Sequence, residues 1–86
     1  MIELHENIPE HIDVTLDTRG LHCPLPILKT KAELSKMQPG EILHVTTTDP
    51  LAPLDFKSYA VRASHTLIYM SEEQDHAEFY LKRGDD

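Results

Sequence analysis

The hydrophobic and polar positions of the chain change from one spacing to another after the first strand-like stretch. Ile12, Val14 and Leu16 alternate with polar residues, which predicts a strand with one buried and one polar face. Helical spacing follows over residues 27–34 and ends before Pro39, since proline cannot continue a helix. The N-terminal part of the pattern therefore predicts a strand followed by a helix.

A second strand and a second helix follow in the same order. A β-branched run predicts a strand over residues 41–48. Asp49 and Pro50 are typical of a helix start, and Pro53 predicts a short separate turn before the helix proper. The core positions of this helix are spaced i, i+3, i+4 and i+7, at Phe56, Tyr59, Ala60 and Ala63.

The last part of the pattern is typical of a hairpin. Two strands are predicted over residues 66–71 and 76–82, on either side of a turn at residues 72–75. The element order is therefore βαβαββ. Parallel strands joined through helices cross over right-handedly, so both helices are expected on one face of the sheet. We predict an α+β fold, an α/β two-layer sandwich, with the other sheet face open to water.

The first predicted helix has one polar stripe and is otherwise largely apolar. Lys29, Glu33 and Lys36 share the polar stripe at i, i+4 and i+7. The apolar positions are Ile27 and Leu34 on one side and Leu28 and Ala32 on another. This distribution is typical of a helix that lies on a sheet.

Length and composition predict one small domain. The 86 residues are 40% hydrophobic, which is enough for a modest core. We expect a loose N-terminal arm over residues 1–10, a single domain over residues 11–83 and an acidic tail over residues 84–86. The sequence has no apolar run of about 18 residues that would indicate a transmembrane helix. Its acidic N-terminus does not resemble a signal peptide, so we expect a cytoplasmic protein without membrane contact.

The charge argues against direct nucleic-acid binding. The formal net charge is −7, with 15 acidic residues against 8 lysines and arginines, whereas nucleic-acid binders usually have the opposite balance. Lys29, Lys31 and Lys36 are interpreted either as a basic patch for an acidic protein partner or as a solvated helix face.

The single cysteine, Cys23, carries the candidate chemistry. Pro24 suits the first helical position, and the residue before a proline favours the non-helical backbone of an N-cap. Cys23 is therefore predicted as the N-cap, with the amides of Leu25 and Ile27 free to face its sulfur. A helix N-terminus favours a thiolate, so the pKa of Cys23 is expected below that of a free cysteine. The alternative is a small buried cysteine that packs like a hydrophobic residue.

The other polar candidates have ordinary structural interpretations. Six histidines show no close pair at helical or strand spacing, so no metal site is predicted. His22 is interpreted as a solvent-facing loop residue rather than a base for Cys23. Lys31 either packs along the edge of the core or attracts a partner. Asp49 is interpreted as a helix cap, and Asp49 and Asp55 are not predicted to form an acid–base pair.

Several motifs, in order, resemble the family of TusA/SirA/YedF-like sulfur carrier proteins. The signature is Gly20-Leu21-x-Cys23-Pro24-x-Pro26. The likeness continues through Lys31, the turn at residues 37–41, Thr48-Asp49-Pro50 and His65-Thr66-Leu67. It spans the chain from Leu16 to Arg83. One departure is Ala63-Ser64, where many members have a glycine.

The resemblance implies both a topology and a function. It implies a mixed four-stranded sheet in the order 1-2-4-3. It also implies that Cys23 accepts sulfane sulfur from a cysteine desulfurase as a persulfide and passes it to an acceptor protein, in tRNA thiolation or a related sulfur-transfer pathway. Cys23 is the one catalytic residue expected, with no cofactor and no metal. A carrier that docks by its tip is expected to be a monomer.

Two other functions remain open from the residues alone. One is a non-catalytic regulatory or protein-binding module on the same fold, with Cys23 as a structural helix cap. The other is a thiol enzyme, which is weakly supported because the chain has no resolving cysteine and no evident oriented base. A persulfide relay of the sulfurtransferase type is therefore favoured over a stand-alone turnover enzyme.

Overall fold

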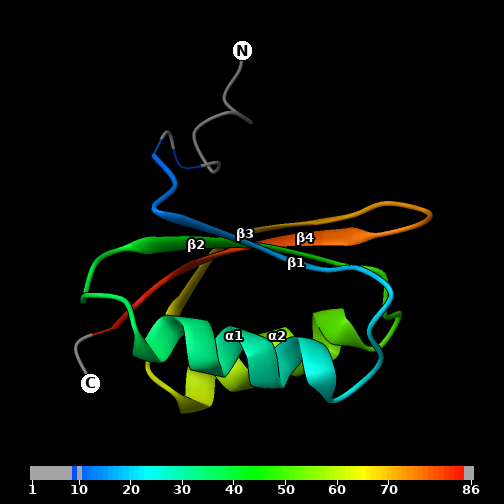
Figure 1. Ribbon diagram of the computed structural model, residues 1–86, viewed down its shortest axis with the longest axis horizontal. Helices are drawn as coiled ribbons and strands as arrows, with labels where there is room; N and C mark the ends of the chain where they lie inside the picture. Colours follow the sequence, from blue (N-terminus) through cyan, green and yellow to red (C-terminus); the bar gives the residue numbers. More distant parts are fainter. Residues whose placement is uncertain (1–8, 10, 85–86) are drawn as a thin grey trace.

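A computed structural model describes residue 9 and residues 11–84 of the chain. The described residues form two layers, a sheet and a pair of helices (Figure 1). The elements are β1 (Val14–Thr18), α1 (Leu25–Ser35), β2 (Ile42–Thr47), α2 (Ala52–Arg62), β3 (Thr66–Glu72) and β4 (Ala77–Lys82). The arm predicted over residues 1–10 lies outside the described residues except for Pro9, and so do the last two residues of the predicted tail.

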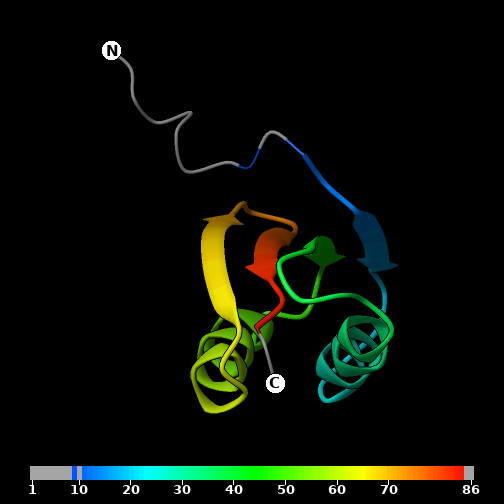
Figure 2. The same ribbon diagram turned by 90° about the vertical axis from the view of Figure 1, so that its left-hand side faces the viewer.

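The sheet has the strand order β1-β2-β4-β3 that the family resemblance implies. β1 runs parallel to β2, with Leu16 opposite Val45. β4 is antiparallel to both of its neighbours, with Phe79 between Val45 of β2 and Met70 of β3. Both helices lie side by side against one face of this sheet (Figure 2). The predicted α+β fold, the mixed sheet and the single helical layer are therefore confirmed.

The core lies between the two central strands and the helices. Burial alternates along β2, where Leu43, Val45 and Thr47 are fully buried and their neighbours are not. From the helical layer, the ring of Phe56 stacks on that of Phe79, with ring centroids 4.2 Å apart. Tyr59 and Ala60 are buried beside Phe56, and Ala63 packs at the margin. The predicted core stripe of the second helix is thus confirmed.

Helix α1 buries a narrower face than its sequence predicts. The buried residues are Pro26, Thr30 and Leu34, spaced four apart, whereas Leu28 is 49% exposed and Ala32 is also exposed. Thr30 can be buried because its hydroxyl donates a hydrogen bond to the Pro26 carbonyl at 2.8 Å. The expectation that Leu28 and Ala32 form a second apolar side against the sheet is therefore wrong.

The connection from α2 to β3 has a backbone conformation that favours glycine, at the position where this chain has Ala63-Ser64. Ser64 follows the helix with a φ of +64°, in the left-handed region that favours glycine. The amide of His65 donates to the carbonyl of Ala60 at 3.1 Å, and the amide of Ser64 to that of Val61 at 3.4 Å. These two bonds form the turn that commonly ends a helix on glycine. In this chain Ser64 adopts this geometry in place of a glycine.

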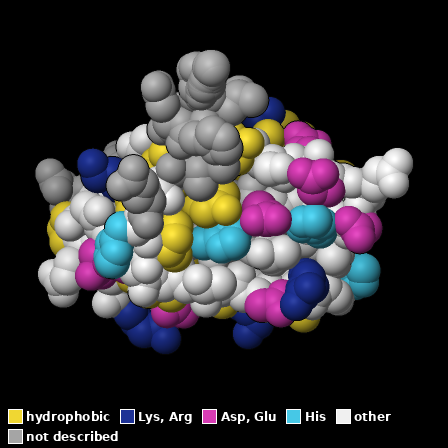
Figure 3. Space-filling model, turned by 90° about the horizontal axis from the view of Figure 1, so that it is seen from above, with side chains coloured by type: hydrophobic (Ala, Val, Ile, Leu, Met, Phe, Trp, Pro, Cys, Tyr) yellow, Lys and Arg dark blue, Asp and Glu magenta, His cyan; other side chains and the backbone are white. Residues whose placement is uncertain are grey.

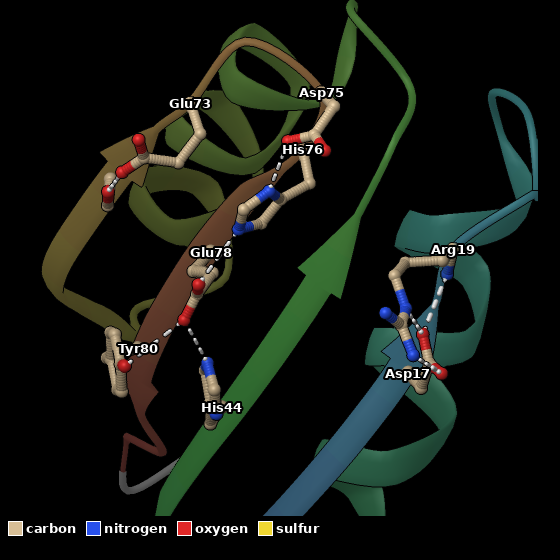
Figure 4. Close-up of polar contacts among 9 residues, drawn as sticks. Asp17, Arg19, His44, Glu73, Asp75, His76, Glu78 and Tyr80 are labelled. Atoms are coloured by element: carbon tan, nitrogen blue, oxygen red, sulfur yellow. Dashed lines mark hydrogen bonds and ion pairs between the residues drawn. The ribbon is translucent and has the colours of Figure 1, made fainter.

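The face of the sheet away from the helices carries a cluster of polar side chains. Histidine and acidic side chains lie next to one another on it (Figure 3). Glu78 accepts hydrogen bonds from His44 at 2.9 Å and His76 at 3.0 Å, one on each carboxylate oxygen, and His76 also contacts Asp75 at 2.8 Å (Figure 4). The open face expected from the polar alternation of β1 is therefore present.

The chain places its helix starts at one end of the molecule. The N-terminal ends of α1 and α2 lie at the right-hand end in Figure 1, together with the turn between β3 and β4. Each helix contains 11 residues, and no helix within residues 9 and 11–84 is long and apolar enough to cross a bilayer. The end that carries the helix starts is also the end that carries the cysteine.

Candidate functional site

The loop between β1 and α1 is held against the end of the neighbouring strand. The hydroxyl of Thr18 donates to the carbonyl of Thr46 at 2.7 Å, and the amide of Gly20 donates to the hydroxyl of Thr48 at 2.9 Å. Gly20 has a φ of +85°, so its lack of a side chain allows the turn that sequence analysis assigned to it. These bonds fix the start of the segment that carries Cys23.

Cys23 is exposed and lies one residue before the N-cap position of α1 instead of occupying it. Helix α1 begins at Leu25, and Pro24 occupies the N-cap position, with no side chain capping the helix. The amide of Leu25 is not free to face the sulfur, because it donates to the carbonyl of His22 at 2.8 Å. The prediction that Cys23 is the N-cap is therefore wrong, and so is the alternative of a buried cysteine.

The thiol of Cys23 has a partner on the second helix. Its sulfur lies 3.4 Å from Oδ2 of Asp55 and donates a hydrogen bond to it. Asp55 belongs to the early part of α2, the segment that follows β2. The two helix starts are neighbours because β1 and β2 are adjacent and parallel.

This contact shifts the pKa of Cys23 in the direction opposite to the one predicted. The hydrogen bond to Asp55 raises the pKa of Cys23 above its ordinary value, and partial desolvation and the negative charges of Asp55 and Asp49 act in the same direction. A thiolate next to a carboxylate is destabilised by like charge. The prediction of a lowered pKa is therefore wrong, because the contact with Asp55 raises the pKa of Cys23.

Asp49 caps the turn before α2 and not the helix itself, whose N-cap is Leu51, so its interpretation as a helix cap is wrong. Its Oδ1 accepts a hydrogen bond from the amide of Leu51 at 3.1 Å, and its carbonyl accepts one from Ala52 at 3.1 Å. The turn precedes α2 proper, as the position of Pro53 indicates. Asp49 itself is only 6% exposed, and its Oδ2 has no hydrogen-bond partner among the described residues.

Within the described residues, no hydrogen bond or ion pair joins the sulfur of Cys23 to the remaining candidates. His22 is exposed in the loop, as expected. Lys31 is exposed on α1, and its Nζ lies 5.9 Å from the centroid of the Tyr59 ring. The long side chain therefore covers the edge of the core, while its charge still reaches solvent. In the described part of the chain, no three or more histidine, cysteine, aspartate or glutamate side chains are grouped to hold a metal ion.

Asp55 is the site residue that sequence analysis missed. The order of elements in the sequence could have indicated Asp55, because the C-terminal ends of adjacent parallel strands lie at one edge of a sheet. Residues just after the first strand and just after the second are therefore brought together. Applied to this chain, that rule places the start of the second helix beside Cys23, and Asp55 is the carboxylate within its first turn.

Comparison with known proteins gives a consistent result. The family model described as Sulfurtransferase TusA matches residues 14–83. The chain is 41% identical over 72 residues to the sulfur carrier protein TusA of Allochromatium vinosum, covering 84% of this chain and 95% of that one. It is 48% identical over 59 residues to a chain of Neisseria meningitidis serogroup A, covering 69% of this chain and 80% of that one.

A solved structure is similar in fold. The SirA-like protein of Desulfitobacterium hafniense superimposes with a TM-score of 0.73 at 19% identity, covering 85% of this chain and 100% of that one. The family model extends from β1 to the residue after β4 and thus includes the cysteine loop and both helix starts. The chain belongs to the TusA sulfurtransferase family.

Proposed function

We propose that this protein is a sulfur carrier in which Cys23 holds sulfane sulfur as a persulfide. The observation that carries the proposal is an exposed thiol, the only one in the 86 residues, that is held in place by a hydrogen bond to Asp55. Membership of a sulfurtransferase family and the likeness to a relative named as a sulfur carrier support the same role.

The transfer step conserves atoms and electrons without a cofactor. The sulfur of Cys23 attacks the outer sulfur of a persulfide on the donor, R–S–SH. The S–S bond of the donor breaks, a new S–S bond forms to Cys23, and the donor cysteine leaves as a thiolate. The proton of Cys23 passes to the carboxylate of Asp55, which is positioned to accept it, and from there to the leaving thiolate. The products are Cys23–S–SH and R–SH.

Release requires a second protein or a reductant. With one cysteine in the sequence, the chain cannot form an internal disulfide that would expel the sulfur. The persulfide must therefore be attacked by a thiol of an acceptor or be reduced. This property suits a relay rather than an enzyme that completes a reaction alone.

Three exposed leucines lie close in sequence to Cys23 and Asp55. Leu25 is 45% exposed two residues after Cys23, and Leu51 and Leu54, just before Asp55, are 59% and 71% exposed. Exposed apolar side chains close to a reactive group favour brief contact with another protein surface. The donor proposed from the family is a cysteine desulfurase, and the acceptor is a protein of tRNA thiolation or a related sulfur-transfer pathway in the cytoplasm.

The binding-module alternative includes Cys23 as a structural helix cap, and the start of α1 does not support that role. No side chain caps α1, and the sulfur instead donates to a carboxylate from another helix.

Intact-mass measurement tests the proposal. The protein is incubated with a cysteine desulfurase and cysteine, and the expected result is a gain of one sulfur atom that dithiothreitol removes. The Cys23→Ser variant is the matched control and is expected to gain nothing. Absence of an adduct on the wild-type protein, or an equal gain by Cys23→Ser, would overturn the proposed carrier role.

A further inference from the structure

A pocket of about 270 Å³ lies between the C-terminal halves of the two helices. We call it the basic pocket; it is lined by Lys31, Leu34, Ser35, Tyr59, Ala63, His65 and Arg83. Both helices end at the left-hand side of Figure 1, opposite the end that carries their starts. Lys31 is six residues beyond the first residue of α1, or about 9 Å along the helix axis. The basic pocket is therefore separate from the thiol of Cys23, which precedes that helix.

Basic side chains and hydroxyls supply the polar lining of the basic pocket. The basic side chains are those of Lys31, His65 and Arg83, and within the described part of the chain no aspartate or glutamate lines the pocket. The hydroxyls are those of Tyr59 and of Ser35, which is already bonded within α1. The whole chain has the opposite balance, with 15 acidic residues against 8 lysines and arginines. A concave site with this lining favours an anion.

The hydroxyl of Tyr59 is an unpaired donor in this pocket. Tyr59 is only 8% exposed, and its hydroxyl forms no hydrogen bond with any residue that the structure describes. Unlike Oδ2 of Asp49, this hydroxyl keeps accessible surface. The charge of Arg83 acts on it, so the guanidinium lies near the same space. Buried hydroxyls normally have a hydrogen-bond partner, and a ligand oxygen in the basic pocket would supply one.

Lys31 is the second group for which an anion would be a new partner. Its Nζ forms no ion pair within the described ranges, and its recorded contact is the ring of Tyr59, 5.9 Å from the centroid. The other two basic side chains also contribute to the structure. Arg83 donates from Nε to the carbonyl of Leu34 at 2.7 Å, and Nδ1 of His65 accepts from the amide of Gly84 at 2.9 Å. Binding is therefore assigned first to Lys31 and Tyr59.

We propose that the basic pocket binds an organic carboxylate. The hydroxyl of Tyr59 and the ammonium of Lys31 donate to the carboxylate oxygens, and such charge-assisted bonds are the stronger ones. Leu34, Ala63 and the ring of Tyr59 give the same pocket an apolar part, which suits the methylene groups of the ligand and not an inorganic oxyanion. The carboxylate belongs either to a small organic acid or to a glutamate side chain of another protein. This site goes beyond the carrier function and does not require Cys23.

Titrations with matched ligands test the site and its chemistry. The ¹⁵N-labelled protein is titrated with glutarate, with its neutral analogue glutaramide, with sulfate, and with capped peptides that contain either two glutamates or two glutamines. We expect shifts in the amides of residues 31–35 and 59–65 with glutarate or the glutamate peptide, and binding at least about tenfold weaker for the neutral partner of each. Binding by the peptide alone identifies a protein as the source, and binding by glutarate identifies a small acid. Shifts confined to other surfaces, no binding of either carboxylate, or equally tight binding of sulfate would overturn the proposal.

Two variants and a matched control sharpen the test. Tyr59→Phe removes only the hydroxyl, and we expect about tenfold weaker binding of the carboxylate. Because that hydroxyl has no partner in the described chain, urea denaturation of Tyr59→Phe should show no loss of stability. Lys31→Gln changes an exposed residue and should weaken binding about threefold. Lys29→Gln removes the same charge from α1 outside the pocket and should bind as the wild type does. Unchanged binding by Tyr59→Phe would be enough to reject the site.

The Cys23→Ser variant separates this inference from the carrier function. It lacks the thiol, and we expect it to bind the carboxylate with the affinity of the wild type. If the wild type gains no sulfur but binds the carboxylate at residues 31–35 and 59–65, the carrier function is wrong and the basic pocket stands. If the wild type gains sulfur but Tyr59→Phe binds the carboxylate as tightly as the wild type, only the pocket proposal is wrong. Loss of binding in Cys23→Ser would also overturn it, because the site would then depend on the thiol.

Discussion

Cys23 and Asp55 are 32 positions apart in the chain, and the thiol of Cys23 donates a hydrogen bond to Oδ2 of Asp55 across 3.4 Å. The contact joins the loop before α1 to the first turn of α2. It holds the sulfur at a defined point on the surface, and it also raises the pKa of the thiol.

Replacing Asp55 by asparagine should lower the pKa of Cys23. The Asp55 carboxylate is the leading cause of the raised pKa, and an amide keeps the size of the side chain without its charge. The midpoint of the pH profile of iodoacetamide alkylation should therefore move to lower pH. Glu33→Gln removes the same charge from the other end of α1 and serves as the control. A midpoint for Asp55→Asn at or above that of wild type would contradict the assigned role of the carboxylate.

Replacing Ser64 by glycine should stabilise the protein. Ser64 has a φ of +64°, where a side chain is strained and glycine is not. We expect a gain of roughly 0.5–1 kcal/mol in the free energy of unfolding, measured by urea denaturation.

Ser58→Gly is the matched control for that substitution. Ser58 is exposed within α2 and has ordinary helical geometry. There glycine should cost about 0.5 kcal/mol instead of stabilising, because serine is itself a weaker helix former than alanine. If both serine-to-glycine variants destabilise the protein, the positive φ at position 64 has no energetic consequence.

The polar cluster on the open face of the sheet should make stability depend on pH through His76. Contacts with Asp75 and then Glu78 raise the pKa of His76, and contacts with His76 and then His44 lower the pKa of Glu78 (Figure 4). Stability from His76 is fully present below its unfolded pKa of about 6.5 and is lost as pH rises through the raised folded value. Stability from Glu78 is present above about pH 4.5 and is lost as pH falls through the lowered folded value.

The difference in unfolding free energy between wild type and His76→Gln should therefore be largest between about pH 4.5 and 6.5 and shrink above that window. Urea denaturation at a series of pH values measures it. His11→Gln removes an exposed histidine that contacts Asp13 at the sheet margin, and it controls for general loss of a histidine. A difference for His76→Gln that grows from pH 6 to pH 9 would refute this account.

Local chemistry explains why much of the fold could be predicted from the amino-acid order. The spacing of Leu43, Val45 and Thr47 predicts a strand face, and Phe56, Tyr59 and Ala60 predict a helix face, because burial repeats with the period of the element. Prolines and glycines mark the ends of these elements through their own backbone geometry. For the same reason the cysteine could be placed between a strand and a helix.

Local rules failed where a residue depends on neighbours from elsewhere in the chain. Leu28 has an apolar side chain but is exposed, while Thr30 is buried because its hydroxyl bonds within the helix. The order of the four strands came from a family resemblance and not from periodicity, since periodicity carries no information on which strands pair.

The electrostatics of the site could be obtained only from the folded chain. The helix start next to Cys23 predicts a lowered pKa, but the carboxylates of Asp55 and Asp49 raise it. Asp55 contacts the sulfur, and the charge of Asp49 acts on it, because parallel pairing of β1 with β2 brings both helix starts to one edge. Coulomb interactions and hydrogen bonds depend on separation in space. The position of the thiol could therefore be predicted from chain order, whereas the direction of its pKa shift depends on the packing of the second helix.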